Sequence, residues 1–94
     1  MAAIGLLTVD LQIYDSGSLK SKRKVVKSIV TRLRNRFNVS VAEVDFQDKW
    51  QRCRLGVCVV SGEGRLADKH LRQALDAIEG MGLAVVLGFD IEIL

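Results

Sequence analysis

The sequence predicts an α+β sandwich, in which two helices cover one face of a four-stranded antiparallel sheet. Apolar and polar residues alternate in four segments, as in strands, and apolar residues recur at helical spacing in two others. Their order is β-α-β-β-α-β, and the link between the second and third strands is short enough for a hairpin. Two right-handed crossovers around a central hairpin form a ferredoxin-like sandwich with expected strand order 4-1-3-2. An unrelated α+β arrangement is the alternative.

The first strand is expected over residues 3–14, where every second residue is apolar. A turn follows at Asp15, and Ser18 is suited to cap the next helix because its hydroxyl can accept from a free backbone N–H. The first helix is expected over residues 19–37. Its apolar stripe consists of Leu19, Val25, Val26, Ile29, Val30, Leu33 and Phe37.

The second strand is expected over residues 38–46. Its alternation slips at Ala42 and Glu43, which indicates a β-bulge. The third strand is expected over residues 51–61, after a short connection, so that the two strands form the central hairpin.

The second helix is expected over residues 65–80, with Gly80 or Gly82 suited to a left-handed cap at its end. The last strand is expected over residues 83–94. The apolar face predicted for it consists of Leu83, Val85, Leu87, Phe89, Ile91 and Ile93. All six elements are assigned to a single domain, residues 1–94.

The charge distribution carries the clearest functional signal in the chain. Between Ser16 and Ala42, eight residues are basic and none is acidic, although the whole chain has a net charge of only +3. These basic residues are Lys20, Lys22, Arg23, Lys24, Lys27, Arg32, Arg34 and Arg36. Such an asymmetry predicts an anionic partner.

Helical geometry places five of these residues opposite the apolar stripe, where they would face solvent. The five are Lys20, Arg23, Lys24, Lys27 and Arg34. Like charges four residues apart destabilise an isolated helix, so an uncompensated basic surface favours a partner that neutralises it. We therefore expect binding to RNA or to a ribosomal subunit through phosphate contacts. A basic surface that is merely solvated is the alternative.

The manner of RNA binding also has sequence indications. The pattern lacks a helix-turn-helix pair, and the expected central strands carry one aromatic residue, Tyr14, at the end of the first. RNA-recognition motifs need aromatic residues on those strands to stack bases. The expected RNA contact is therefore electrostatic and shape-based.

The sequence offers no catalytic set of residues, no metal site and no cofactor motif, so an enzyme is not expected. His70 is the only histidine and is read as a packing residue. Cys53 and Cys58 should point to opposite faces of a strand, so we expect neither a shared metal nor a disulfide. Glu43 and Asp45 would share one face of a regular strand, where a solvated edge is the simplest interpretation.

The chain has no apolar run of the roughly 18 residues that a membrane helix needs, and no signal peptide. The prediction is a cytoplasmic protein without a membrane partner. A second hypothesis is a protein–protein assembly module, with a homodimer built on the open sheet face or an edge strand. Trp50 is expected in the core; if exposed, it would be an interface anchor. A third hypothesis is an anionic-ligand sensor at a helix N-terminus near Gly17 or Gly64.

Four segments of the sequence resemble the YlxP-like family of small bacterial proteins. They are 18–23 (SLKSKR), 32–45 (RLRNRFNVSVAEVD), 47–52 (QDKWQR) and 89–94 (FDIEIL). The resemblance covers essentially the whole chain and implies a ferredoxin-like fold. It also implies that the gene for the protein lies beside genes for translation initiation and ribosome maturation. Such a neighbourhood favours ribosomal RNA as the anionic partner. It implies no catalytic residue and no cofactor.

Overall fold

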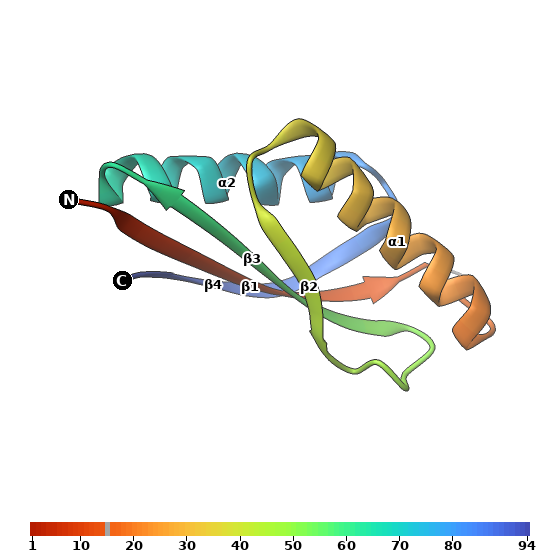
Figure 1. Ribbon diagram of the computed structural model, residues 1–94. Helices are drawn as coiled ribbons and strands as arrows, with labels where there is room; N and C mark the ends of the chain where they lie inside the picture. Colours follow the sequence, from red (N-terminus) through yellow and green to blue (C-terminus); the bar gives the residue numbers. More distant parts are fainter. Residues whose placement is uncertain (15) are drawn as a thin grey trace.

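The computed structural model describes residues 1–14 and 16–94, and contains four strands and two helices in the expected order. The elements are β1 (Ala3–Ile13), α1 (Leu19–Arg36), β2 (Ser40–Asp45), β3 (Arg52–Ser61), α2 (Gly64–Gly80) and β4 (Ala84–Ile93). The strands form one antiparallel sheet in the order β2-β3-β1-β4. Both helices lie on the same face of the sheet (Figure 1). The ferredoxin-like fold and its strand order are confirmed; Asp15, in the predicted turn, lies outside the described residues.

The core lies between the sheet and the two helices. Alternate residues of β1 and β3 point into it, because successive side chains of a strand face opposite sides. On the helices, the buried positions fall three or four residues apart, as one face of a helix requires. The main core residues are Leu7, Val9, Leu11, Ile13, Leu55, Val57, Val59, Val26, Ile29, Leu33, Ala67, Leu71, Ala74, Leu75 and Ile78.

The beginning of α1 and the end of α2 are capped by residues that the sequence predicts. The Ser18 side chain accepts a hydrogen bond from the backbone N–H of Ser21 at 3.1 Å, which satisfies one free donor of α1. After α2, Gly82 has a φ of +68°, in the left-handed region that glycine tolerates at no steric cost. Of the two predicted glycines, Gly82 therefore takes the left-handed conformation, and Gly80 ends the helix.

The bulge in β2 lies one or two residues later than predicted. The pairing with β3 shifts between Glu43 and Asp45, so Val44 is the additional residue. Glu43 is paired with the core residue Leu55, whereas Asp45 is paired with Arg54 on the other face. The strand is therefore not regular, and Glu43 and Asp45, which would share one face of a regular strand, lie on opposite faces because the bulge reverses the alternation.

A second bulge, which was not predicted, divides β4. Its pairing with β1 shifts between Asp10 and Leu11, and Leu87 is the additional residue. Val86 pairs with the core residue Leu11 and packs against the core, while Val85 lies on the opposite face. The prediction of one continuous apolar face from Leu83 to Ile93 is therefore wrong at Val85.

Candidate nucleic-acid interface

The five predicted contact residues of α1 are exposed, and together they form what we call the basic side of α1. They are Lys20, Arg23, Lys24, Lys27 and Arg34. None of them is in an ion pair with an acidic residue of the described chain, where such pairs involve Lys22, Arg54 and Arg72. Their charges are therefore available to a polyanion.

Within the basic side of α1, three residues share a flank. Arg23, Lys27 and Arg34 are separated by four and seven residues, which brings them back to one side of a helix. Arg34 fixes which side this is, because its Nη2 atom donates to the carbonyl oxygen of Val41 in β2 at 2.8 Å. The three cations thus follow the flank of α1 that lies along the edge strand β2.

Lys22 belongs to the basic segment of the sequence but not to its surface. Its side chain is fully buried, and its Nζ atom lies 2.7 Å from Oε2 of Glu43. The same Nζ donates to the carbonyl oxygen of Phe46 at 2.6 Å. Its position had a sequence signal: Lys22 precedes Val26, Ile29 and Leu33 by four, seven and eleven residues, so it continues the apolar stripe.

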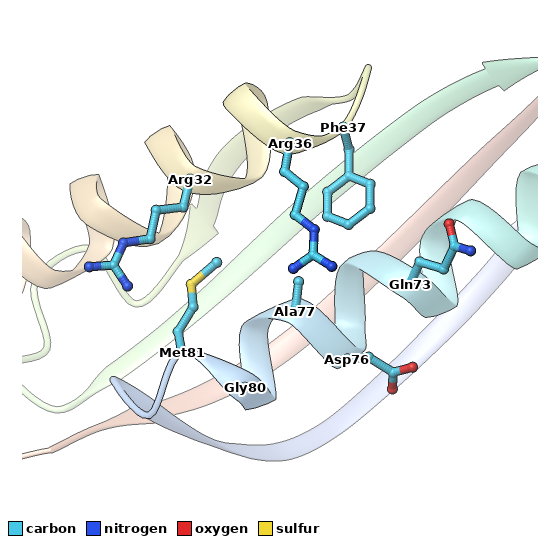
Figure 2. A pocket seen from close by; sticks show the side chains of 8 residues that line it. All are labelled: Arg32, Arg36, Phe37, Gln73, Asp76, Ala77, Gly80 and Met81. Atoms are coloured by element: carbon cyan, nitrogen blue, oxygen red, sulfur yellow. The ribbon is translucent and has the colours of Figure 1, made fainter.

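Arg32 and Arg36 lie on the other flank of α1 and line a hollow of about 680 Å³ between the two helices. Figure 2 shows Arg36 reaching between the helices toward Ala77 of α2, beside Phe37. The guanidinium carbon of Arg36 lies 5.3 Å from the centre of the Phe37 ring. The apolar side chains of Phe37, Ala77 and Met81 line the same hollow, so both arginines lie beside apolar surface.

The basic residues of α2 do not enlarge the positively charged surface formed by the basic side of α1. Arg72 pairs with Asp68 one turn earlier, at 2.9 Å. The beginning of α2, which carries Arg65 and Lys69, lies at the opposite end of the molecule from the beginning of α1 (Figure 1). The strongest concentration of unpaired positive charge therefore stays on α1.

The open face, the side of the sheet that the helices leave uncovered, carries an ion-pair network. Arg54 donates to both carboxylate oxygens of Asp10, at 2.6 and 3.2 Å, and also contacts Asp45 at 3.2 Å. The hydrogen bonds from Arg54 hold the pKa of Asp10 below its usual value of 3.8. Asp10 in turn raises the pKa of Arg54, so both groups are charged at neutral pH.

The two cysteines lie on opposite faces, as predicted. Cys53 is buried in the core, Cys58 is half-buried, and both are free thiols. Burial raises the pKa of the Cys53 thiol to about 12, with a further contribution from the Glu43 carboxylate. Among the described residues, no group of three or more His, Cys, Asp or Glu side chains is arranged to hold a metal ion.

The sequence did not predict the exposure of Trp50 or the backbone conformation of Phe46, two aromatic residues of the β2–β3 connection. Trp50 is 55% exposed, so the expectation that it packs in the core is wrong: it lies in an exposed connection between β2 and β3. Phe46 has a φ of +65°, and its ring lies against Arg52 and Arg54 of β3. No sequence pattern signals such a conformation, which is uncommon for a residue other than glycine.

Comparison with known proteins identifies the family. A family model described as "Protein of unknown function (DUF503)" matches residues 4–91, and the chain belongs to this family. It is 45% identical over 76 residues to "Uncharacterized protein YlxP" of Bacillus subtilis (strain 168), covering 81% of this chain and 83% of that protein. The YlxP-like resemblance of the sequence is thereby confirmed.

The fold also has a counterpart among solved structures. The chain is similar to "De novo designed protein Foldit4", with a TM-score of 0.57 and 10% sequence identity, over 100% of this chain and 97% of that chain. At this identity the likeness concerns the fold alone. Within the described residues, no helix is both long and apolar enough to cross a membrane.

Proposed function

We propose that the protein binds RNA, and that its partner in the cytoplasm is ribosomal RNA within a ribosomal subunit. One observation carries this proposal: the basic side of α1 presents five exposed cations with no acidic partner among the described residues. A row of fixed positive charge on a rigid helix suits the sugar–phosphate backbone, whose neutralisation releases counterions. The protein would act by binding, without catalysis.

Packing and a hydrogen bond hold helix α1 in a fixed position, so its basic side chains start from fixed points. Its buried stripe holds it on the sheet, and Lys22 ties its first turn to the β2–β3 connection. The gene neighbourhood that the YlxP-like resemblance implies also favours a ribosomal partner. Roughly five phosphate contacts predict a log–log slope of affinity against salt of about −3 to −5.

The test compares the wild type with Arg23→Glu/Lys24→Glu/Lys27→Glu. These three side chains are exposed and, unlike Arg34, donate no hydrogen bond to the backbone of β2. Lysates are separated on sucrose gradients at low and moderate salt, and purified protein is titrated with RNA. We expect the wild type alone to travel with a ribosomal subunit, and salt to release it.

A matched control is Arg65→Glu/Lys69→Glu on α2, compared with Arg23→Glu/Lys27→Glu on α1, which makes the same change of net charge; Arg72 is left unchanged because it pairs with Asp68. We expect the α2 variant to keep most of the RNA affinity, because its changes lie away from the basic side of α1. Equal losses in the two double variants would mean that net charge alone is sensed. Salt-independent binding by the wild type would exclude the phosphate mechanism.

A homodimer without RNA binding is the second candidate, and exposed apolar side chains favour it. Ile4 and Val60 are adjacent partners on the open face of β1 and β3, and both are exposed. Leu87 and Phe89 are about half exposed on the edge strand β4. Light scattering tests this candidate: a dimer that persists on dilution and ignores RNA would favour it over the first.

A further inference from the structure

Three of the five aromatic residues gather at one end of the molecule, which we call the aromatic end: Tyr14, Phe46 and Trp50. In the β1–β3 ladder, Gln12 pairs with Arg52, and the N–H of Ile13 donates to Gln51 at 2.9 Å. Tyr14 directly follows Ile13, and Trp50 directly precedes Gln51, so both residues extend from this paired end of β1 and β3. Both are more than half exposed, at 54% and 55%, which is unusual for such large apolar surfaces in one place.

Phe46 is held at this end in a strained conformation. Its φ of +65° is costly for a residue with a large side chain, and such strain tends to persist at functional sites. Its N–H donates to Oδ1 of Asp45 at 2.8 Å, and its carbonyl oxygen accepts from Nζ of Lys22 at 2.6 Å. These bonds fix the residue so that its ring meets Arg52 and Arg54, at 5.0 and 4.8 Å.

The aromatic end adjoins the beginning of the basic side of α1. The bond from Lys22 to Phe46 and one from Gln51 Nε2 to the Ser16 carbonyl, at 3.3 Å, tie the two together. Figure 1 shows the start of α1 and the β2–β3 connection at the same end of the molecule.

Among the described residues of the aromatic end, three cations balance three acids: Lys49, Arg52 and Arg54 against Asp10, Asp45 and Asp48, with Arg54 paired to both Asp10 and Asp45. The positive charge that favours an anion is therefore that of the adjoining basic side of α1. Exposed aromatic rings beside a cationic track are the combination that binds single-stranded nucleic acids, whose bases stack while the phosphates follow the charge.

We propose that the aromatic end stacks unpaired bases on the exposed rings of Tyr14 and Trp50, so that the RNA bound by this protein is single-stranded where it meets them. The inference rests on the proposed RNA binding and adds the class of RNA. A duplex keeps its base faces within its own stack and cannot use these rings. The backbone of the strand continues onto Lys20, Arg23 and Lys24 of α1.

Trp50 is the only tryptophan, so its intrinsic fluorescence reports directly on this end. Oligouridylate of about ten nucleotides, within the usual site size for single strands, is titrated into the full chain. A duplex RNA with the same number of phosphates is titrated in parallel. We expect saturable quenching of Trp50 by the single strand and tighter binding of the single strand than of the duplex.

Substitutions then separate stacking from apolar bulk. Trp50→Leu should weaken binding of a dye-labelled oligouridylate roughly 5- to 150-fold, the range for loss of one base stack, whereas Trp50→Phe keeps a ring and most of the affinity. Phe89→Leu is the matched control, because Phe89 is also about half exposed but lies in the middle of the edge strand β4. Thermal unfolding verifies that each variant is folded.

The outcomes distinguish this inference from the proposed function. Salt-sensitive RNA binding that leaves Trp50 fluorescence and the Trp50→Leu affinity unchanged would overturn the stacking role and keep the phosphate mechanism. Absence of RNA binding would overturn both. Fluorescence that changes with protein concentration but not with RNA would assign the aromatic end to contact between copies of the chain and overturn the inference.

Discussion

The ammonium group of Lys22 lies 2.7 Å from the Glu43 carboxylate, beneath the helix whose other lysines face solvent. Lys22 is fully buried, whereas the Glu43 side chain keeps 18% of its surface exposed. A charge withdrawn from water in this way needs both its ion pair and its hydrogen bonds. The pair therefore couples α1, β2 and the carbonyl of Phe46 in a single polar contact.

Substitution of Lys22 should therefore lower the stability of the folded protein. In Lys22→Ala, the Glu43 carboxylate loses its counter-charge and the Phe46 carbonyl loses its donor. We expect the free energy of unfolding to fall by about 3 kcal/mol, the lower end of the range for a broken buried pair, because Glu43 is partly exposed. Urea denaturation of the purified variant measures this change.

Lys24→Ala is the control for Lys22→Ala, since Lys24 lies on the exposed side of the same helix. It should change the free energy of unfolding by no more than about 0.5 kcal/mol. The double change Lys22→Met/Glu43→Leu should recover most of the lost stability, because no buried charge is left unpaired. Similar stability of the two alanine variants would show that the buried pair contributes nothing.

The sequence predicted the fold well because its signals are strong and mutually consistent. Alternation in β1 runs without a break from Ala3 to Ile13, and the stripe of α1 keeps helical spacing for its full length. The bulge in β4 was hidden because Val85, Val86 and Leu87 are all apolar. Three consecutive apolar residues do not show at which one the alternation reverses.

In the candidate site, the sequence predicts only those side chains whose exposure follows from helical geometry. The exposed positions of Lys20, Arg23, Lys24, Lys27 and Arg34 follow from the apolar stripe alone. The aromatic end depends on the left-handed φ of Phe46 and on the exit path of the connection that carries Trp50. Phe46 is fixed in part by a tertiary contact, the hydrogen bond that its carbonyl oxygen accepts from Lys22, and in part by the bond that its N–H donates to the adjacent Asp45 carboxylate. The contact with Lys22 has no local sequence signal.

Gly80 and Gly82 should respond oppositely to alanine. Gly80 is helical, and a Cβ there would meet no atom within 4 Å, so Gly80→Ala should stabilise the protein by about 0.5 to 1 kcal/mol. Gly82 has a φ of +68°, so Gly82→Ala should destabilise it by about 1 kcal/mol or more. Thermal unfolding checks both; shifts of the same sign would contradict the assigned cap.

The ion pair of Asp10 and Arg54 should make stability depend on pH below neutrality. The folded-state pKa of Asp10 is lowered by Arg54, so its stabilising contribution is complete above the ordinary value of 3.8. It is lost as the pH falls through the lower, folded-state pKa. The midpoint of thermal unfolding should therefore be higher in the wild type than in Asp10→Asn at pH near 7, and the gap should close in strong acid.

Asp90→Asn serves as the control for this pH dependence. Asp90 lies on the same face, opposite Thr8, and is in no ion pair with a described residue. Its substitution should give no comparable gap at either pH. The gap for Asp10→Asn should shrink only partly in high salt, because direct hydrogen bonds join Asp10 to Arg54. A gap that widens in acid would contradict the assigned direction.

The two thiols should differ sharply in reactivity. The pKa of Cys53 is raised to about 12 and its side chain is buried, so at neutral pH it is neither ionised nor accessible. Cys58 is half-buried on the open face. Iodoacetamide should modify Cys58 in the native protein and Cys53 only after denaturant is added, as peptide mass spectrometry would show. In Cys58→Ser, labelling of Cys53 should follow global unfolding; rapid native labelling would mean that the core opens locally beside Lys22 and Glu43.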